Sequence, residues 1–219
     1  MHLNQVYGQS RVMLVLWGLL LLAALSALIT GRWSLVFVSL STLALALTPV
    51  ILASRFHLTL PLPFLLATTL FTFATVFLGE AFDFYNRFWW WDIFLHGGSA
   101  VGFGLMGFLF VFMLFEGDRY AAPPIFIAFI TFCVAMTVGA TWEIFEFLMD
   151  KSFGLNMQKS GLPDTMGDLI VDAMGAMFAA LCGFIYLKGQ KAGVMTGLIQ
   201  QFVELNRQLY RKSKNRLRK

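Results

Sequence analysis

The stretch VMLVLWGLLLLAALSALI, residues 12–29, contains 18 consecutive residues without a charge or a proline. Such a stretch is typical of a membrane-spanning helix, because a bilayer core about 30 Å thick needs roughly 20 apolar residues of helix. Five further apolar stretches follow along the chain, at residues 33–53, 60–79, 93–115, 121–149 and 169–187. The sequence therefore predicts an all-α, polytopic membrane protein with six transmembrane helices.

The overall composition supports this class of protein and excludes several others. Of the 219 residues, 58% are apolar and 13% are charged, whereas a soluble domain carries about 25% charged residues. A chain of this size has too little interior to hide so much apolar surface from water. We therefore exclude a soluble enzyme, a nucleic-acid-binding protein and a disordered chain. Cys133 and Cys182 lie inside apolar stretches and form no CxxC pair, which argues against a disulfide framework or a zinc knuckle.

The basic residues predict the orientation in the membrane. Nine of the sixteen Lys and Arg residues lie after Leu187, and an excess of such residues marks cytoplasmic segments. We expect residues 1–187 to form the transmembrane domain and residues 188–219 to form a cytoplasmic basic tail. With six spans, the N-terminus faces the cytoplasm as well. Most of the acidic residues then fall on the outer side.

The tail itself has an apolar periodicity. Apolar side chains recur at helical spacing at Val194, Leu198, Phe202, Leu205 and Leu209. This pattern predicts an amphipathic basic helix over residues 193–210, which would lie on the inner leaflet and be attracted by anionic lipid. A positive tail that only sets the topology is the alternative.

Ionisable side chains recur on one face of each of the last three predicted spans. Residues three, four or seven apart lie on the same side of a helix. The set comprises Asp92 and His96 in the fourth span, Glu143, Glu146 and Asp150 in the fifth, and Asp164, Asp168 and Asp172 at the start of the sixth. All three groups fall at the end of the span that we expect on the outer side.

Small residues predict that these three helices pack closely, because small side chains allow membrane helices to approach one another. They are Gly98, Ala100, Gly102, Gly104 and Gly107 in the fourth span, and Gly175, Ala179 and Gly183 in the sixth. Close packing would bring the three acidic faces together, with Glu143 and Asp172 lying deepest.

A cluster of acids inside a membrane needs neutralisation, since an ionised Asp at mid-span costs about 2.5–3.5 kcal/mol. Protons, a bound cation or a water-filled cavity could each provide it. Oxygen ligands suit Mg²⁺, Ca²⁺ or Mn²⁺, and a histidine among them admits Zn²⁺ or Mn²⁺. A divalent-metal site is one of these three solutions. Its candidate ligands are Asp92, His96, Glu143, Glu146, Asp164 and Asp168.

Simpler roles are open for some of these residues. Asp92 and Asp164 could each cap the helix that begins nearby, and Asp150 could pair with the adjacent Lys151. His96 taken alone could be a hydrogen-bonded interior histidine. Capping does not explain Glu143, Glu146 and Asp168. The candidate catalytic residues are Glu143, Asp168 and His96, and the accompanying ones are Asp150, Gln158 and Asp172.

Three segments carry a resemblance to known proteins: WDIFLHGGS (91–99), WEIFEF (142–147) and QKSGLPDTMGDLIVDAMGA (158–176). Together they resemble the YjdF-like family of bacterial inner-membrane proteins and, more loosely, the VanZ-like group. The resemblance covers residues 91–176 and implies a location in the bacterial inner membrane, with Gly175 as a close-packing glycine. The polar positions that it implies are Asp92, His96, Glu143, Glu146, Gln158, Asp164 and Asp168.

Three functions are consistent with these residues. The first is a metal-dependent enzyme that acts on a lipid or envelope intermediate at the outer leaflet, with Glu143 or Asp168 as general base. The second is a proton- or cation-coupled transporter or flippase, for which a homodimer would supply the inner gate that six spans without an inverted repeat lack. The third is an accessory membrane protein without catalysis. The one-sided position of the acids favours the enzyme, with membrane lipid and no nucleic acid as partner.

Overall fold

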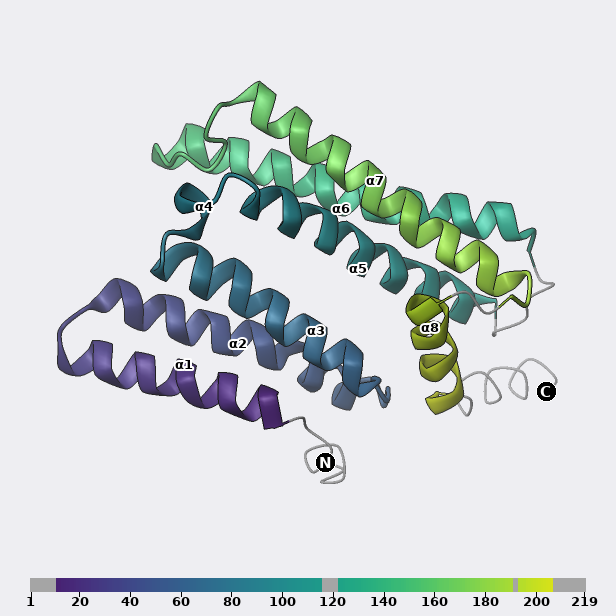
Figure 1. The fold of residues 1–219 in the computed structure, drawn as a ribbon, viewed down its shortest axis with the longest axis horizontal. Helices are drawn as coiled ribbons and strands as arrows, with labels where there is room; N and C mark the ends of the chain where they lie inside the picture. The colour runs from purple at the N-terminus through teal and green to yellow at the C-terminus, as the bar shows by residue number, and fades with distance from the viewer. Residues whose placement is uncertain (1–10, 116–121, 191–192, 207–219) are drawn as a thin grey trace. The chain divides into compact units, whose positions relative to one another are not determined.

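The computed structural model describes residues 11–115, 122–190 and 193–206, and within these residues all regular secondary structure is helical (Figure 1). The short helices are α4 (Phe84–Arg87) and α8 (Gly193–Leu205). The helices long and apolar enough to cross a membrane are α1 (Arg11–Ile29), α2 (Trp33–Arg55), α3 (Leu62–Thr72) continued by the π-helix η2 (Phe73–Ala81), α5 (Trp91–Leu114), α6 (Pro124–Phe153) and α7 (Leu162–Leu187). The predicted fold class, all-α with six membrane-spanning helices, is confirmed.

The chain divides into two compact units. The predicted division into a transmembrane domain, residues 1–187, and a cytoplasmic tail, residues 188–219, stays a prediction. One unit ends at Trp89, also includes Glu204–Asn206, and contains α1, α2, α3 and η2. The other begins at Trp90 and runs to Val203, so that it contains α5, α6 and α7. All the candidate site residues belong to this second unit.

In the second unit, α5, α6 and α7 lie side by side as a three-helix bundle (Figure 1). Because successive helices alternate in direction, the beginning of α5, the end of α6 and the beginning of α7 share one end of the bundle. Gly175 allows α7 to approach α5, since a Cβ at this position would lie 2.7 Å from the carbonyl oxygen of Gly97 and 2.8 Å from Cβ of Ala100. The predicted role of Gly175 in close packing is confirmed.

The other glycines predicted to pack in α5 fall into two groups, one that follows the prediction and one that does not. A Cβ at Gly104 would lie 2.5 Å from Cβ of Ala179, so this glycine also faces α7. Gly98 is exposed, and a Cβ at Gly102 would meet nothing within 4 Å. These two glycines therefore do not belong to the packing face. Their spacing from Gly104 and Gly107 turns them away from the interior of the bundle.

At the end of the bundle opposite the acids, the interior is apolar. Phe108 and Phe112 of α5 pack with Ile127 of α6 and with Tyr186 and Leu187 of α7 in one buried cluster. The rings of Phe108 and Phe112 each meet the Tyr186 ring edge-on, with centroids 6.0 and 5.9 Å apart. The polar and apolar halves of the interior are therefore separate along the helix axes.

The predicted helix of the tail is present as α8, but its buried face differs from the prediction. Ile199 and Phe202 are buried, and Ile199 joins the apolar cluster of the bundle. Val194 and Leu205, which we expected on the same apolar face, are 76% and 46% exposed. The expected face is right for Phe202, which is buried, and for Leu198, which is half-buried, and it is wrong for Val194 and Leu205. Leu209 and the rest of the chain from 207 lie outside the described residues.

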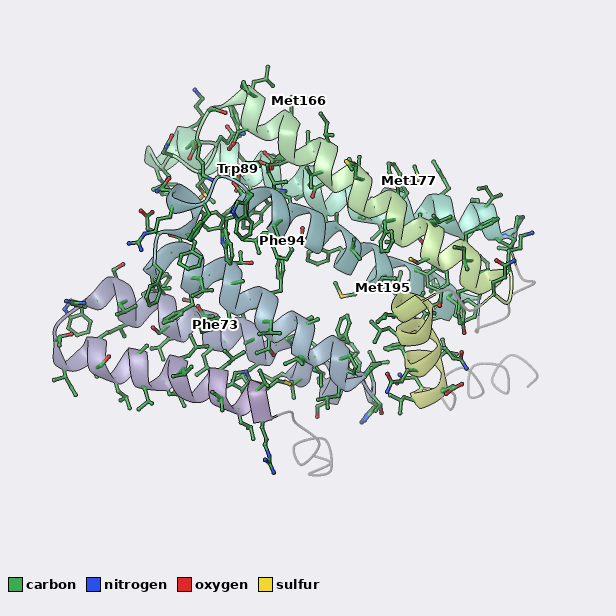
Figure 2. The ribbon with its side chains drawn as sticks, in the orientation of Figure 1. Phe73, Trp89, Phe94, Met166, Met177 and Met195 are labelled. Atoms are coloured by element: carbon green, nitrogen blue, oxygen red, sulfur yellow. The ribbon has the colours of Figure 1, made fainter. Side chains whose placement is uncertain are left out.

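The outer surface of the bundle is apolar as well. Met166 and Met177 project away from the bundle along α7 (Figure 2) and are 47% and 59% exposed. Ile170 and Met174 on the same helix are exposed too. Large apolar side chains on the outside of a folded bundle are favourable in lipid and costly in water, as a membrane protein requires.

Candidate metal centre

The interior of the bundle is polar at the end where α5 and α7 begin. His96 of α5, Glu143 of α6, and Asp168 and Asp172 of α7 are all buried there, with exposed fractions between 1% and 7%. Each belongs to the interior face of its helix. The structure therefore brings together the three acidic faces that the sequence analysis expected to converge.

The imidazole of His96 lies among carboxylates from all three helices. Its Nε2 atom is 3.8 Å from Oδ1 of Asp92 and 3.8 Å from Oε1 of Glu143. Its Nδ1 atom is 3.4 Å from both carboxylate oxygens of Asp172. The two ring nitrogens thus face different acids, and Asp172 is in a position to hold the orientation of the ring.

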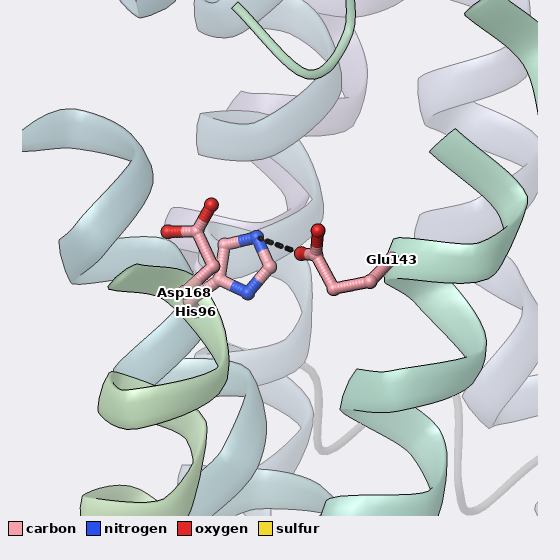
Figure 3. Close-up of side chains that lie close together, drawn as sticks. All are labelled: His96, Glu143 and Asp168. Atoms are coloured by element: carbon pink, nitrogen blue, oxygen red, sulfur yellow. Dashed lines mark ion pairs between the residues drawn. The ribbon is translucent and has the colours of Figure 1, made fainter. Parts of the chain in front are cut away.

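Two compact sets of ligand atoms lie next to each other, each spanning no more than 4.8 Å. The first, here the histidine triad, consists of His96, Glu143 and Asp168, all buried (Figure 3). The second, here the acidic triad, consists of Asp92, Asp164 and Asp168. Asp168 belongs to both triads. Either set offers donors of the type and spacing that a divalent ion requires.

In the part of the chain that the structure describes, the Glu143 carboxylate has one neighbour that can carry a positive charge, the His96 imidazole, whose Nε2 lies 3.8 Å from Oε1. The carboxylate is 4% exposed, and both of its oxygens are buried without a hydrogen-bond partner among the residues that the structure describes. A buried carboxylate whose oxygens accept no hydrogen bond is costly even beside a histidine. The carboxylate instead points toward His96 and Asp168 (Figure 3), where a bound cation would offset its charge.

The sequence analysis missed Gly139, which makes room for the deepest acid. A Cβ at this position of α6 would overlap the Asp172 carboxylate. Gly139 precedes Glu143 by four residues and therefore lies on the same face of α6. That spacing was the signal that could have identified it.

Hydrogen bonds to the Asp150 side chain fix the loop between α6 and α7. Its Oδ1 accepts the backbone N–H of Met157 at 2.7 Å, and its Oδ2 accepts that of Gln158 at 2.9 Å. The alternative that Asp150 pairs with Lys151 is wrong, because the Lys151 ammonium lies over the Phe147 ring, 5.7 Å from its centroid. Asp150 therefore shapes the loop beside the site.

Gln158 and Lys159 connect this loop to the helices of the site. The Gln158 side-chain amide donates to Oγ1 of Thr165 at 2.7 Å, and Thr165 is a second residue that the sequence analysis missed. The Lys159 ammonium donates to Oδ2 of Asp92 at 2.9 Å. A loop residue thus supplies a positive charge to the acidic triad.

Three candidates, Asp92, Asp164 and Glu146, remain, and their surroundings differ from those that the sequence predicted. Trp90 and Gly161 are the N-cap residues of α5 and α7, so neither Asp92 nor Asp164 is the N-cap residue, although both lie where the positive end of the helix dipole favours a negative charge. Both acids lie inside the first turn, in the acidic triad. Glu146 is buried but outside both triads, and it accepts a hydrogen bond from Nε1 of Trp142 at 2.8 Å.

The fold and this cluster define an integral membrane protein with a buried polar site between three of its helices. The chain belongs to the family described as "Predicted membrane protein (DUF2238)", which matches residues 11–189. It is similar to a Thermotoga maritima protein described as an uncharacterized protein, with 31% identity over 112 residues that cover 49% of this chain and 57% of that protein. The match thus spans little more than half the length of that relative. No solved structure matches the chain.

Proposed function

We propose that this protein is a divalent-metal-dependent membrane enzyme that acts on a lipid or envelope intermediate, with the metal held by His96, Glu143 and Asp168. One observation above all supports the metal. The carboxylate of Glu143 is buried without a hydrogen-bond partner among the described residues and lies beside two further ligand side chains. A divalent cation offsets this buried charge and satisfies its oxygens at once.

The number of ligands supports catalysis over a purely structural metal. Structural zinc sites usually close with four protein ligands, whereas catalytic zinc sites keep three and leave a position open. A bound metal of this kind supplies an activated water and stabilises charge on a phosphoryl or carbonyl oxygen. The Asp172 carboxylate lies beside Nδ1 of His96, so that Nε2 is the ring nitrogen that faces Glu143. A carboxylate outside the set of ligands commonly orients a ligating histidine in this way.

The apolar half of the bundle argues against a transport path through the same unit. A path needs polar groups along its whole length. Among the described residues, the interior beyond the triads is instead lined mainly by Phe108, Phe112, Ile127 and Tyr186, and the one buried threonine of α6 there, Thr131, donates its hydroxyl to the backbone of its own helix. The polar groups therefore form a site at one end, which fits a substrate that approaches from the membrane boundary.

We place this site at the extracytoplasmic face of a bacterial inner membrane, with both chain termini in the cytoplasm. The excess of Lys and Arg after Leu187 supports this orientation. The segments 91–99, 142–147 and 158–176 support a YjdF-like identity within the family. Reporter fusions or accessibility labelling at the loop that contains Lys159 would test the orientation.

Elemental analysis of the purified, detergent-solubilised protein tests the metal. We expect about one Mn²⁺, Mg²⁺ or Zn²⁺ per chain in the wild type, and loss of that metal in Glu143→Gln and in Asp168→Asn. Glu146→Gln is the matched control, because Glu146 is a buried acid of the same helix that lies outside both triads. Equal metal content in all four proteins would contradict the assignment.

Reconstitution tests the reaction. The protein is placed in vesicles of bacterial phospholipid and polyprenyl phosphate, and the lipids are followed by mass spectrometry with Mn²⁺ and after chelation. We expect metal-dependent consumption of one lipid species in the wild type and in Glu146→Gln, and none in Glu143→Gln. Metal-free protein that takes up protons on acidification would favour the transporter instead.

A further inference from the structure

We infer that the ammonium of Lys159 takes the place of a metal ion at the acidic triad, and that it thereby restricts the two triads together to one divalent ion. The inference depends on the proposed metal in the histidine triad. It concerns a different group of atoms, however, because Asp92 and Asp164 do not belong to that triad.

The ammonium of Lys159 occupies a defined position. Its Nζ lies 2.9 Å from Oδ2 of Asp92, a residue of another element and 67 positions away in sequence. The two side chains are 29% and 20% exposed. A pair withdrawn from water to this extent is screened less than a surface ion pair.

The loop that carries Lys159 is built to hold it there. Asp150 accepts two backbone N–H groups of the loop, and Gln158 is bonded to Thr165 on α7. Gly154 and Gly161, with φ of 67° and 71°, turn the chain at the two ends of the loop. The backbone of Lys159 is therefore fixed by the hydrogen bonds of the loop, and only the side chain itself has to be ordered for the ammonium to contact Asp92.

The charges of the two triads balance differently with and without this lysine. Four carboxylates, those of Asp92, Glu143, Asp164 and Asp168, carry a formal charge of −4. One divalent ion and the ammonium contribute +3, which leaves −1. Without the ammonium, one ion leaves −2, and a second divalent ion brings the sum to zero.

The acidic triad is compact enough to hold such a second ion. Asp168 is shared by both triads, and a shared carboxylate is suited to bridge two ions, which in two-metal sites lie about 3.5–4 Å apart. The ammonium at Asp92 repels a divalent ion at that place. Lys159 thus determines how many ions the site takes.

Mn²⁺ binding to the full-length protein in detergent tests the inference, with bound metal counted by elemental analysis and spin coupling followed by electron paramagnetic resonance. We expect one Mn²⁺ per chain in the wild type and in Lys159→Arg, which keeps the charge. We expect two in Lys159→Met, with the spectrum of a coupled pair. In Lys159→Met combined with Asp164→Asn, the count returns to one.

Each outcome separates the inference from the proposed function. One Mn²⁺ in both the wild type and Lys159→Met overturns the role of Lys159 and leaves the histidine triad standing. A wild type that contains neither Mn²⁺ nor Mg²⁺ nor Zn²⁺ after incubation with each overturns the proposed metal itself. If Lys159→Met does not elute as a monodisperse peak, Lys159→Gln is the second neutral variant, since it retains a hydrogen-bond donor for Asp92. One Mn²⁺ per chain in Lys159→Gln would likewise overturn the role of Lys159.

Discussion

Gly139 of α6 lies directly against the carboxylate of Asp172 on α7, so that no side chain fits between them. The contact places the most buried acid of the cluster, 1% exposed, within 3.4 Å of the His96 imidazole. A glycine without any polar atom therefore contributes to the site, because it decides how closely Asp172 can approach α6.

Replacing Gly139 by alanine should destabilise the protein and displace Asp172. A Cβ at this position must push the carboxylate away, and inserting a methyl group into a packed interior costs about 1–3 kcal/mol. Thermal unfolding in detergent measures the effect. Gly102→Ala is the control, since a Cβ there meets nothing within 4 Å, and equal unfolding temperatures for the two variants would contradict this account.

Gly175→Ala should separate α5 from α7. The new methyl group would meet the backbone oxygen of Gly97, which cannot rotate away as a side chain can. We expect a loss of about 1–3 kcal/mol in stability, together with weaker Mn²⁺ binding, because the triads span both helices. Gly167→Ala on the same helix, where a Cβ meets nothing within 4 Å, should leave Mn²⁺ binding unchanged and should not lower stability, because alanine favours the helix by about 1 kcal/mol over glycine.

His96 and Asp172 should be energetically coupled. Their side chains approach to 3.4 Å in a buried environment, and contacting residues of one network show coupling energies of about 0.5–3 kcal/mol. A double-mutant cycle of His96→Gln and Asp172→Asn, measured by unfolding in detergent, should therefore be non-additive. Strict additivity would mean that the contact contributes nothing to stability.

Asp150→Ala should release the loop that carries Lys159. Removing the carboxylate leaves the N–H groups of Met157 and Gln158 without their acceptors, so their protection from hydrogen exchange should fall at least tenfold. Exchange followed by mass spectrometry on this loop gives the measurement. Lys151→Ala, which removes only a contact with the Phe147 ring, should retain the protection seen in the wild type.

Periodicity within single helices was enough to predict much of the candidate site. The step from Asp92 to His96 and the two steps from Asp164 through Asp168 to Asp172 are properties of one helix each, and both sets lie on the interior side, as expected. Glu146 shows the limit of this reasoning. It shares the face of Glu143 by spacing, yet it bonds to Trp142 and lies outside both triads, because a face about 100° wide contains more residues than a cluster can use.

The amino-acid sequence by itself determined the class of protein, the number of spans and the helices that carry the acids, since length and hydropathy alone decide whether a helix is stable in a bilayer. Only the tertiary structure decided which acids meet, that Gly139 makes room for Asp172, that Lys159 reaches Asp92, and which face of α8 is buried. The physical reason is the range of the interactions. Hydropathy and helical spacing act between neighbours along the chain, whereas the contacts between elements depend on how each helix is rotated about its axis, which close packing of the whole bundle determines.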